Sequence, residues 1–186
     1  MLYYTNTNLT KTNFLFYINK TKNFYGYIDT DLIKKSLYFY TVTSLTQFNL
    51  FSDLLASDFP NYKLRFLMIY NVISLVFNNR IIIKGLLFED GIIDTVVQLF
   101  VSAGWYERET WDLYGIFFIN NLDLRRILND YGFVGHPFKK DFPLSGFLEY
   151  VFVFRLGLLL SNQINMMQEF RFFNRGTPWT YNYLNN

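Results

Sequence analysis

Apolar residues recur along this chain with two spacings, one typical of helices and the other of strands. A helix is predicted over residues 31–40, where Ile33, Leu37 and Tyr40 fall at helical spacing after a capping Asp-Thr pair. Residues 14–18 are short and aromatic and predict a strand. Residues 46–53 alternate in part, which predicts a strand with Phe48 and Leu50 on one face.

The longest apolar stretches, residues 62–77 and 80–88, are rich in β-branched and aromatic residues. They are apolar on both faces, and the turn-prone pair Asn78-Asn79 lies between them. We expect an antiparallel hairpin that is buried on both sides over much of its length and forms the centre of a sheet.

Helical spacing returns after Gly91. It predicts a helix that ends near Gly104 and buries one face, composed of Ile93, Val96, Val97, Phe100 and Val101. A second, short helix is expected from Trp105, stopping at Gly115.

The last third of the chain has a different character. Residues 129–146 hold three glycines and two prolines and predict a long loop, kept ordered by the packing of its aromatic residues Tyr131, Phe133, Phe138 and Phe142. Residues 147–160 predict a strand with a bend at Gly157, and an extended arm should follow.

Together these patterns indicate an α+β fold. We expect a mixed, mainly antiparallel sheet with helices packed on it, followed by the long ordered loop and an extended C-terminal arm. The corresponding division is an N-terminal extension of residues 1–28, a domain of residues 29–146 and an arm of residues 147–186.

Composition limits the chemistry. Lys and Arg number 17 and Asp and Glu 15, so no broad field attracts nucleic acid or an anionic membrane. The absence of cysteine excludes thiolate-held iron–sulfur clusters and Cys-type zinc sites, and one histidine is too few for a His-rich metal centre. No Gly-x-Gly triplet offers a nucleotide loop.

The abundance of Phe, Tyr, Asn and Ile is what AU-rich codons produce, which suggests an organellar gene. Residues 1–28 contain no acid and no Arg, and we expect an uncleaved start made inside the compartment. The apolar runs 66–77 and 156–160 fall short of the roughly 20 residues that span a bilayer, so no transmembrane segment is expected.

Charge is concentrated in one region. Eleven charged residues of nearly balanced sign lie there: Glu107, Arg108, Glu109, Asp112, Asp123, Arg125, Arg126, Asp130, Lys139, Lys140 and Asp141. Balanced signs indicate mutual pairing more than a binding field.

On a helix, residues 107–109 sweep about 200°, so at least one of their charges must point into the protein. We expect Arg125 or Arg126 to clasp Glu107 or Glu109, because a buried charge needs a partner. Arg108 and Asp112 are four residues apart and are expected to pair along the helix.

Three interpretations of this cluster stay open from the residues alone. It is an internal ion-pair cluster that locks the glycine-rich loop to the helix, or a partner interface, or an acid–base site with Glu107 or Glu109 as the acid and His136 as the base. No nucleophile or metal set accompanies the acid–base interpretation. Because His136 precedes Pro137 it is held extended, which is typical of a structural histidine.

The stretches "AGWYERETWDLYGIFF", "DLRRILNDYGFVGHPFKKDFPLSG" and "QEFRFF…TPW" resemble the 30 kDa subunit family of respiratory complex I, the proton-pumping NADH:ubiquinone oxidoreductase. The positions that the resemblance marks as structural or interface residues are Glu107, Arg108, Glu109, Asp112, Arg125, Arg126, Asp130, His136, Pro137, Lys140, Asp141, Pro143 and Arg171. The chain departs from the family pattern at Asn121-Leu122, where His-Pro is usual, at Lys139, where Arg is usual, and in the apolar stretch 147–160.

The resemblance implies a non-catalytic core subunit in the matrix arm of a mitochondrial complex, peripheral to the inner membrane and binding no nucleic acid. Its partners would be the 49 kDa quinone-module subunit, along which the arm lies, and adjacent iron–sulfur subunits. It implies that iron–sulfur clusters, FMN and ubiquinone belong to those neighbours, with no cofactor, metal or catalytic residue in this chain. One alternative is an organellar ribosomal RNA-binding protein, which requires a one-signed basic face. Another is a small hydrolase that uses the Glu pair and His136.

Overall fold

The computed structural model describes residues 2–3, 15–18 and 24–173 of the chain. The chain divides into two compact units, residues 1–143 and residues 144–186. Most of the expected N-terminal extension and the "TPW" motif at residues 177–179 lie outside the described residues.

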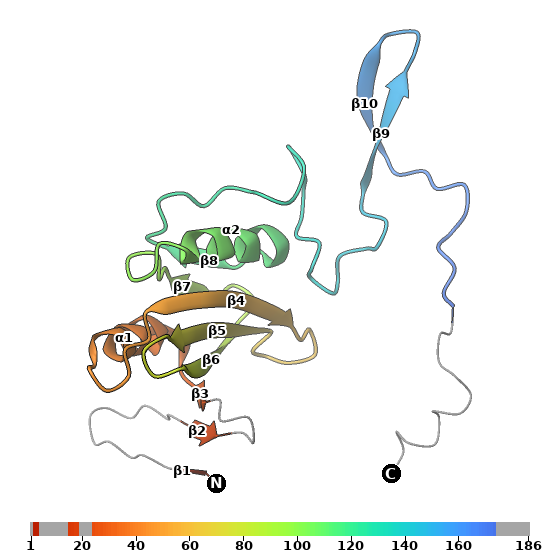
Figure 1. The fold of residues 1–186 in the computed structure, drawn as a ribbon. Coiled ribbons are helices and arrows are strands. Elements are labelled where there is room, and N and C mark those ends of the chain that lie inside the picture. The colour runs from red at the N-terminus through yellow and green to blue at the C-terminus, as the bar shows by residue number, and fades with distance from the viewer. Residues whose placement is uncertain (1, 4–14, 19–23, 174–186) are drawn as a thin grey trace, which may run out of the picture. The chain divides into compact units, whose positions relative to one another are not determined.

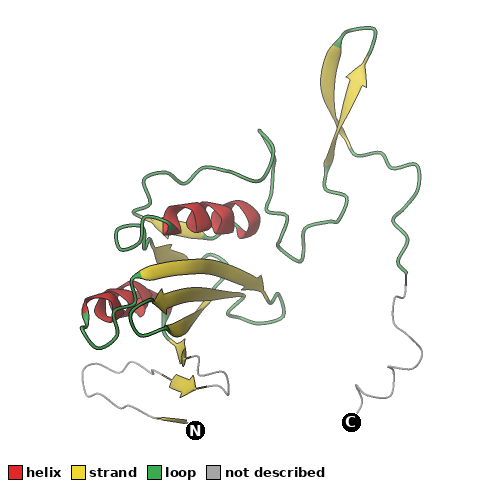
Figure 2. Cartoon of the chain, viewed as in Figure 1, coloured by secondary structure: helices red, strands yellow, loops and turns green. Residues whose placement is uncertain are grey.

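Among the described residues, the first unit contains two helices and several strands (Figures 1 and 2). In chain order they are β1 (Leu2–Tyr3), β2 (Leu15–Ile18), β3 (Phe24–Tyr27), α1 (Thr30–Val42), β4 (Leu50–Asp58), β5 (Phe66–Ser74), β6 (Asn79–Leu87), β7 (Ile92–Asp94), α2 (Ala103–Tyr114) and β8 (Phe117–Ile119). The second unit contains β9 (Leu148–Val153) and β10 (Leu158–Gln163).

The main sheet has the strand order β1-β2-β3-β6-β5-β4. Its neighbours are antiparallel except β3 and β6, which are parallel, and a small parallel pair is formed by β7 and β8. The fold is therefore α+β, with a mixed, mainly antiparallel sheet and helices packed on it, as the sequence predicts.

The core lies on one face of this sheet. Along β5 every second residue is fully buried, and Tyr70 pairs across the strands with Leu54 of β4 and Ile83 of β6, which are buried too. The helices pack on the sheet: α2 contacts β4 and α1 contacts β6. A Cβ at Gly85 of β6 would lie 2.6 Å from Ile33 Cδ1 of α1, so glycine permits the close approach of that helix.

Three predicted elements are confirmed. The hairpin predicted over residues 62–77 and 80–88 is β5–β6 inside the main sheet, with Asn78 in the left-handed region (φ 50) at the turn. The expected burial on both sides is wrong, because only alternate residues of these strands are buried and the core covers one face. The helix expected over residues 31–40 is α1, and the short helix stops at Gly115, whose φ of 79 makes it a left-handed C-cap.

The helix predicted between Gly91 and Gly104 is wrong. Residues 92–94 form β7, which pairs with β8, and residues 95–102 are turns and loop that lead into α2 at Ala103. The N–H of Thr95 donates to the carbonyl of Ile119, and Val96 donates to the Glu107 side chain, so tertiary hydrogen bonds replace helical ones. The β-branched residues of this stretch favour that outcome.

Two strand predictions also need correction. The strand expected at residues 46–53 begins at Leu50 and runs to Asp58, because Gln47 adopts a positive φ of 43 in the preceding turn. Phe48 is buried before the strand, whereas Leu50 is exposed, so the two do not share a face. Residues 147–160 form the hairpin of β9 and β10, not a bent strand, because Gly157 with φ 62 completes a reversing turn.

No helix or strand occurs between Asn120 and Phe147, the green segment after β8 in Figure 2. Within it, the rings of Phe133 and Phe142 lie 5.8 Å apart, and Phe138 packs edge-on against Tyr114 of α2 at 5.6 Å. Tyr131 is the exception to the expected aromatic packing, because it is 97% exposed.

Candidate functional site

The candidate site lies where α2 meets the loop of residues 120–143, and we call it the α2–loop site. Its centre is a pair of fully buried carboxylates, Glu107 and Asp112, both 0% exposed on α2. The prediction that at least one charge of residues 107–109 points inward is confirmed by Glu107.

Glu107 holds the segment before α2 and the start of the loop together. Its Oε2 accepts hydrogen bonds from the Thr95 hydroxyl at 2.6 Å and the Asn121 amide at 2.8 Å, and its Oε1 accepts the Val96 N–H at 2.7 Å. Burial raises the pKa of Glu107, and these hydrogen bonds offset the rise in part. Neither Arg125 nor Arg126 clasps it, so that prediction is wrong. Neutral hydrogen-bond donors from two segments of the chain take the place of the expected guanidinium group.

Asp112 gathers the middle of the loop. Its Oδ2 accepts the backbone N–H groups of Ile127, Leu128 and Asn129 at 2.9 to 3.2 Å, and its Oδ1 accepts the Asn129 amide and the Arg126 guanidinium, both at 2.7 Å. Burial opposes this charge, but the hydrogen bonds outweigh it and lower the pKa of Asp112 to about 2.

Arg126 is fixed on more than one side. Besides Asp112 it donates to the Gly135 carbonyl at 3.0 Å, and its guanidinium lies 5.5 Å from the Trp111 ring and 5.8 Å from the Phe133 ring. A planar cation that stacks on aromatic rings while donating to a carboxylate is a contact that lysine cannot reproduce. Arg126 therefore ties two parts of the loop to α2.

Arg108 does not pair with Asp112 along the helix, contrary to the prediction. Its Nε donates to the Arg125 carbonyl at 3.0 Å, and its Nη1 lies 3.9 Å from Asp123. Arg125 itself is exposed and pairs with Asp123. The loop lies so close to α2 that one of its backbone carbonyl groups accepts the hydrogen bond of Arg108, which Asp112 on the same helix was expected to accept.

His136 sits against the end of α2. Its Nδ1 lies 3.0 Å from the backbone oxygen of Asp112, so Nδ1 carries the proton and donates. A Cβ at Gly115 would lie 2.7 Å from the imidazole Cδ2, so glycine at this C-cap also makes room for the ring. The geometry does not pair His136 with Glu107, whose oxygens accept from other groups.

A second cluster ties the end of the loop to the sheet. Arg65, 7% exposed, donates two hydrogen bonds to Asp58 at 2.7 and 2.9 Å and others to Glu89 at 2.6 Å and Asp141 at 2.8 Å. The backbone N–H of Lys140 donates to Asp58 at 2.8 Å. The hydrogen bonds and charge of Arg65 lower the pKa of Asp58 and Asp141.

The other predicted site residues take peripheral positions. Glu109 is exposed and makes no hydrogen bond or ion pair in the part of the chain that the structure describes. Asp130 caps a loop turn by accepting the Tyr131 N–H, Pro137 is half-buried and Pro143 is exposed. Arg171 belongs to the second unit, where its guanidinium lies 5.7 Å from the Phe173 ring.

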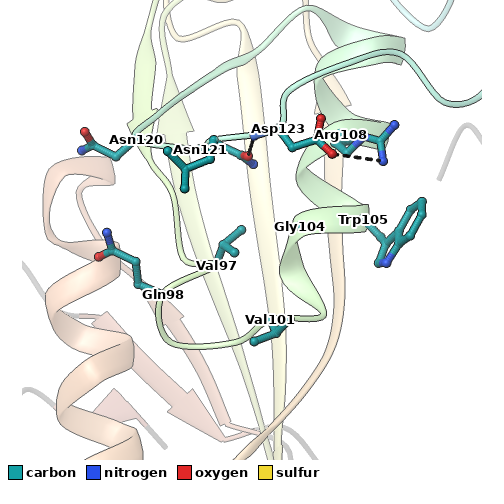
Figure 3. Close-up of a pocket in the computed structure, with 10 residues that line it drawn as sticks. Val97, Gln98, Val101, Gly104, Trp105, Arg108, Asn120, Asn121 and Asp123 are labelled. Carbon is teal, nitrogen blue, oxygen red and sulfur yellow. Dashed lines mark hydrogen bonds and ion pairs between the residues drawn. The ribbon is translucent and has the colours of Figure 1, made fainter.

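A groove of about 560 Å³ opens beside the α2–loop site (Figure 3). Val97 and Val101 line one side, Trp105 flanks it from the first turn of α2, and Asn120 and Asn121 come from the loop. The Arg108 guanidinium lies 5.1 Å from the Trp105 ring. Asn121 thus touches both the groove and the buried Glu107.

Sequence reasoning missed several residues of the two clusters. Thr95 and Asn121 carry no charge, and Asp58, Arg65 and Glu89 lie far from the charged segment along the chain. Arg65 had one visible signal, since it is a charge directly before a long apolar stretch and would need a partner once buried.

In both clusters, charged groups form ion pairs, and the buried carboxylates accept hydrogen bonds at both of their oxygens. Over the described ranges, no group of three or more His, Cys, Asp or Glu side chains is placed to hold a metal ion. In those same ranges no helix has the length and apolarity needed to cross a membrane.

The fold and the site define an α+β domain whose long loop is tied to one helix and one sheet end by buried ion pairs. The family described as respiratory-chain NADH dehydrogenase, 30 Kd subunit, matches residues 27–148. The chain belongs to this family.

Relatives agree with that assignment. The chain is 45% identical over 151 residues to NADH dehydrogenase [ubiquinone] iron-sulfur protein 3 of Patellifolia webbiana, a match that covers 81% of this chain and 79% of that protein. It is 48% identical over 133 residues to NADH-ubiquinone oxidoreductase subunit 9 of Reclinomonas americana, covering 72% and 65%.

Solved structures give the same fold. A chain in the structure of the membrane-bound sulfane sulfur reductase, an archaeal respiratory membrane complex, matches with a TM-score of 0.62 at 21% identity. The match covers 70% of this chain and 78% of that one.

Proposed function

We propose that this chain is a non-catalytic core subunit of respiratory complex I. In this role it supports assembly and the quinone-reducing module during electron transfer from NADH to ubiquinone, which is coupled to proton pumping. The observation that carries the proposal is Asp112: a fully buried carboxylate whose oxygens are all taken by donors from the loop. Such a carboxylate fixes a loop in place and is not available to a substrate.

Redox cofactors are assigned to neighbouring subunits in this proposal. The names of relatives include the words iron-sulfur protein. This chain has no cysteine, so it offers no thiolate to a cluster. Iron–sulfur clusters, FMN and ubiquinone would then be bound by adjacent subunits, and this chain would hold those subunits in register.

The partners follow from family membership. The proposed partners are the 49 kDa quinone-module subunit and the adjacent iron–sulfur subunits, on the matrix side of the mitochondrial inner membrane. The long loop and the C-terminal region are the parts expected to dock. Arg171, in the second unit, is among the residues proposed to meet a partner.

The test separates assembly from turnover. Glu107→Ala and Arg126→Ala should each reduce the amount of assembled complex several-fold, because each leaves buried polar groups unpaired. NADH:ubiquinone turnover per assembled complex should stay within about twofold of wild type. Native gel electrophoresis with in-gel NADH oxidation measures the first quantity, and normalised turnover the second.

Glu109→Ala is the matched control, because Glu109 is an exposed neighbour on the same helix that belongs to neither cluster. It should change neither quantity. Normal assembly with lost turnover in Glu107→Ala would instead support the acid–base interpretation. The ribosomal alternative would require the chain to migrate with ribosomes, and the balanced charges of residues 107–141 argue against it.

A further inference from the structure

Tyr70 is the largest fully buried side chain among the described residues, and it carries a polar group at its end. It lies on β5, 0% exposed, and pairs with Leu54 of β4 and Ile83 of β6. Its hydroxyl has no hydrogen-bond partner within the described part of the chain. A buried phenol usually has a partner, because an unpaired hydroxyl in a core destabilises the fold. The Tyr70 hydroxyl therefore needs an explanation.

Tyr70 lies close to the start of α2. The ring of Phe51 in β4 lies 6.4 Å from the Tyr70 ring and 5.9 Å from the ring of Tyr106, the residue before Glu107 on α2. Burial raises the pKa of the Tyr70 phenol, and the negative charge of Glu107 raises it further. The ring contacts and this charge effect both place Tyr70 in the neighbourhood of Glu107.

The Glu107 carboxylate has room for one more hydrogen bond. An ionised carboxylate offers about four lone-pair sites, two on each oxygen. Oε2 accepts two hydrogen bonds, from Thr95 and Asn121, whereas Oε1 accepts one, from the Val96 N–H. An open acceptor site on Oε1 and an unpartnered donor on Tyr70 therefore lie in the same part of the core.

The two groups do not bond to each other directly, since the Tyr70 hydroxyl has no partner in the described part of the chain. One water molecule has the chemistry that joins them, because it accepts from a phenol and donates to a carboxylate. Buried waters commonly bond to polar groups that are otherwise unpaired. A metal ion fits less well, because no group of three or more His, Cys, Asp or Glu side chains within the described ranges is placed to hold one.

We infer that one buried water bridges Tyr70 and Glu107, accepting the Tyr70 O–H and donating to Oε1 of Glu107. Tyr70 is then a positioning residue of the α2–loop site, which extends from the loop through α2 to β5. The bridge favours the ionised form of Glu107, because a fourth donor stabilises its negative charge. The charge of Lys34 on α1 acts in the same direction, since it lowers the pKa of Glu107. The inference concerns groups of this chain alone, so it goes beyond the proposed function and does not depend on it.

Titration of the Glu107 carboxyl, followed by NMR in the full chain, tests the bridge. Tyr70→Phe removes only the hydroxyl, so the pKa of Glu107 should rise by at least about half a pH unit. The folding equilibrium constant at pH 7 should fall at least about threefold, because the water loses a partner. An unpartnered hydroxyl predicts instead that the variant is as stable as wild type or more stable. That result, or a pKa of Glu107 that stays unchanged or falls, would overturn the inference.

Tyr106→Phe is the matched control, because the Tyr106 ring also packs on Phe51 and is half-buried. It should leave the pKa of Glu107 unchanged. A second measurement needs no variant: magnetisation transfer from a long-lived water to the Val96 N–H, which donates to the same Oε1, should be present in wild type. Its absence in wild type would overturn the inference even if Tyr70→Phe failed to fold. Transfer at full strength in a folded Tyr70→Phe variant would overturn it as well.

Discussion

Glu107 and Asp112 are both fully buried on α2, yet their pKa values move in opposite directions. Glu107 accepts from neutral donors, so burial dominates and its pKa rises. Asp112 accepts from more donors, one of them the Arg126 guanidinium, so its pKa falls to about 2. Two buried carboxylates on one helix therefore give two distinct dependences of stability on pH.

Asp112 is expected to stabilise the fold at neutral pH and to lose that effect in acid. Its pKa is about 2 in the folded chain against an ordinary 3.8, so its contribution is complete above 3.8 and disappears as pH falls to about 2. That difference corresponds to about 2 kcal/mol. Asp112→Asn should cost about 3 kcal/mol at pH 7, because an amide nitrogen would face Arg126 or Asn129. Urea unfolding should show the gap to wild type narrowing as pH falls from about 4 to about 2.

Glu107→Gln should show the opposite trend. A raised folded pKa means that the contribution of Glu107 is complete below its unfolded pKa and is lost as pH rises through the folded value. The glutamine side chain of this variant cannot ionise, so the variant should be least stable relative to wild type at low pH, by about 1 to 2 kcal/mol. The same unfolding series measures it. A gap that widens with rising pH would contradict this, because it would mean that folding lowers the pKa of Glu107.

Helical geometry predicted that at least one charge of residues 107–109 points into the protein, but not that Glu107 is among them, nor which groups are its partners. Spacing along a helix is fixed by about 3.6 residues per turn, whereas Thr95 and Asn121 reach Glu107 only through the folding of two loops. Pairing rules based on opposite charge favoured Arg125 and Arg126. Backbone N–H groups, a hydroxyl and amides supply most of the donors instead, and no charge pattern marks those groups.

At the scale of elements, the Arg65 cluster joins the loop to the ends of β4 and β5. Arg65→Ala would leave the Asp58 carboxylate buried, with only the Lys140 N–H donating to it. We expect a loss of about 3 kcal/mol. Limited proteolysis should then cut near Lys139 and Lys140 at least about tenfold faster than in wild type. Unchanged cleavage would mean that the α2 contacts alone hold this end of the loop.

Elements with a clear local pattern could be predicted from the sequence, including the short strand β2 at residues 15–18, whereas elements fixed by long-range pairing could not. The β5–β6 hairpin, α1 and α2 each combine periodic apolar residues with a local start or stop signal, such as Gly115. The stretch from Ile93 to Val101 has helical spacing as well, yet it forms β7 and turns. There the β7–β8 pairing and the Glu107 hydrogen bonds, both long-range, override the local pattern.

At the scale of the whole molecule, the chain concentrates its buried ion pairs where the loop meets the domain, and it carries exposed apolar surface on the β9–β10 hairpin. The ion pairs fix internal geometry, and under the proposed function the exposed surface would be available to other subunits. This division of roles is what we expect of a subunit that organises its neighbours.

The most direct test of the scaffold account is a graded series at the α2–loop site in the intact complex. Arg126→Lys, Asp112→Asn and Arg126→Ala should weaken the loop to different extents, and the amount of assembled complex should fall in step with the stability of each variant. NADH:ubiquinone turnover per assembled complex should remain level across the series. Constant assembly with turnover that falls from variant to variant would contradict the account, because these residues would then act in the reaction itself.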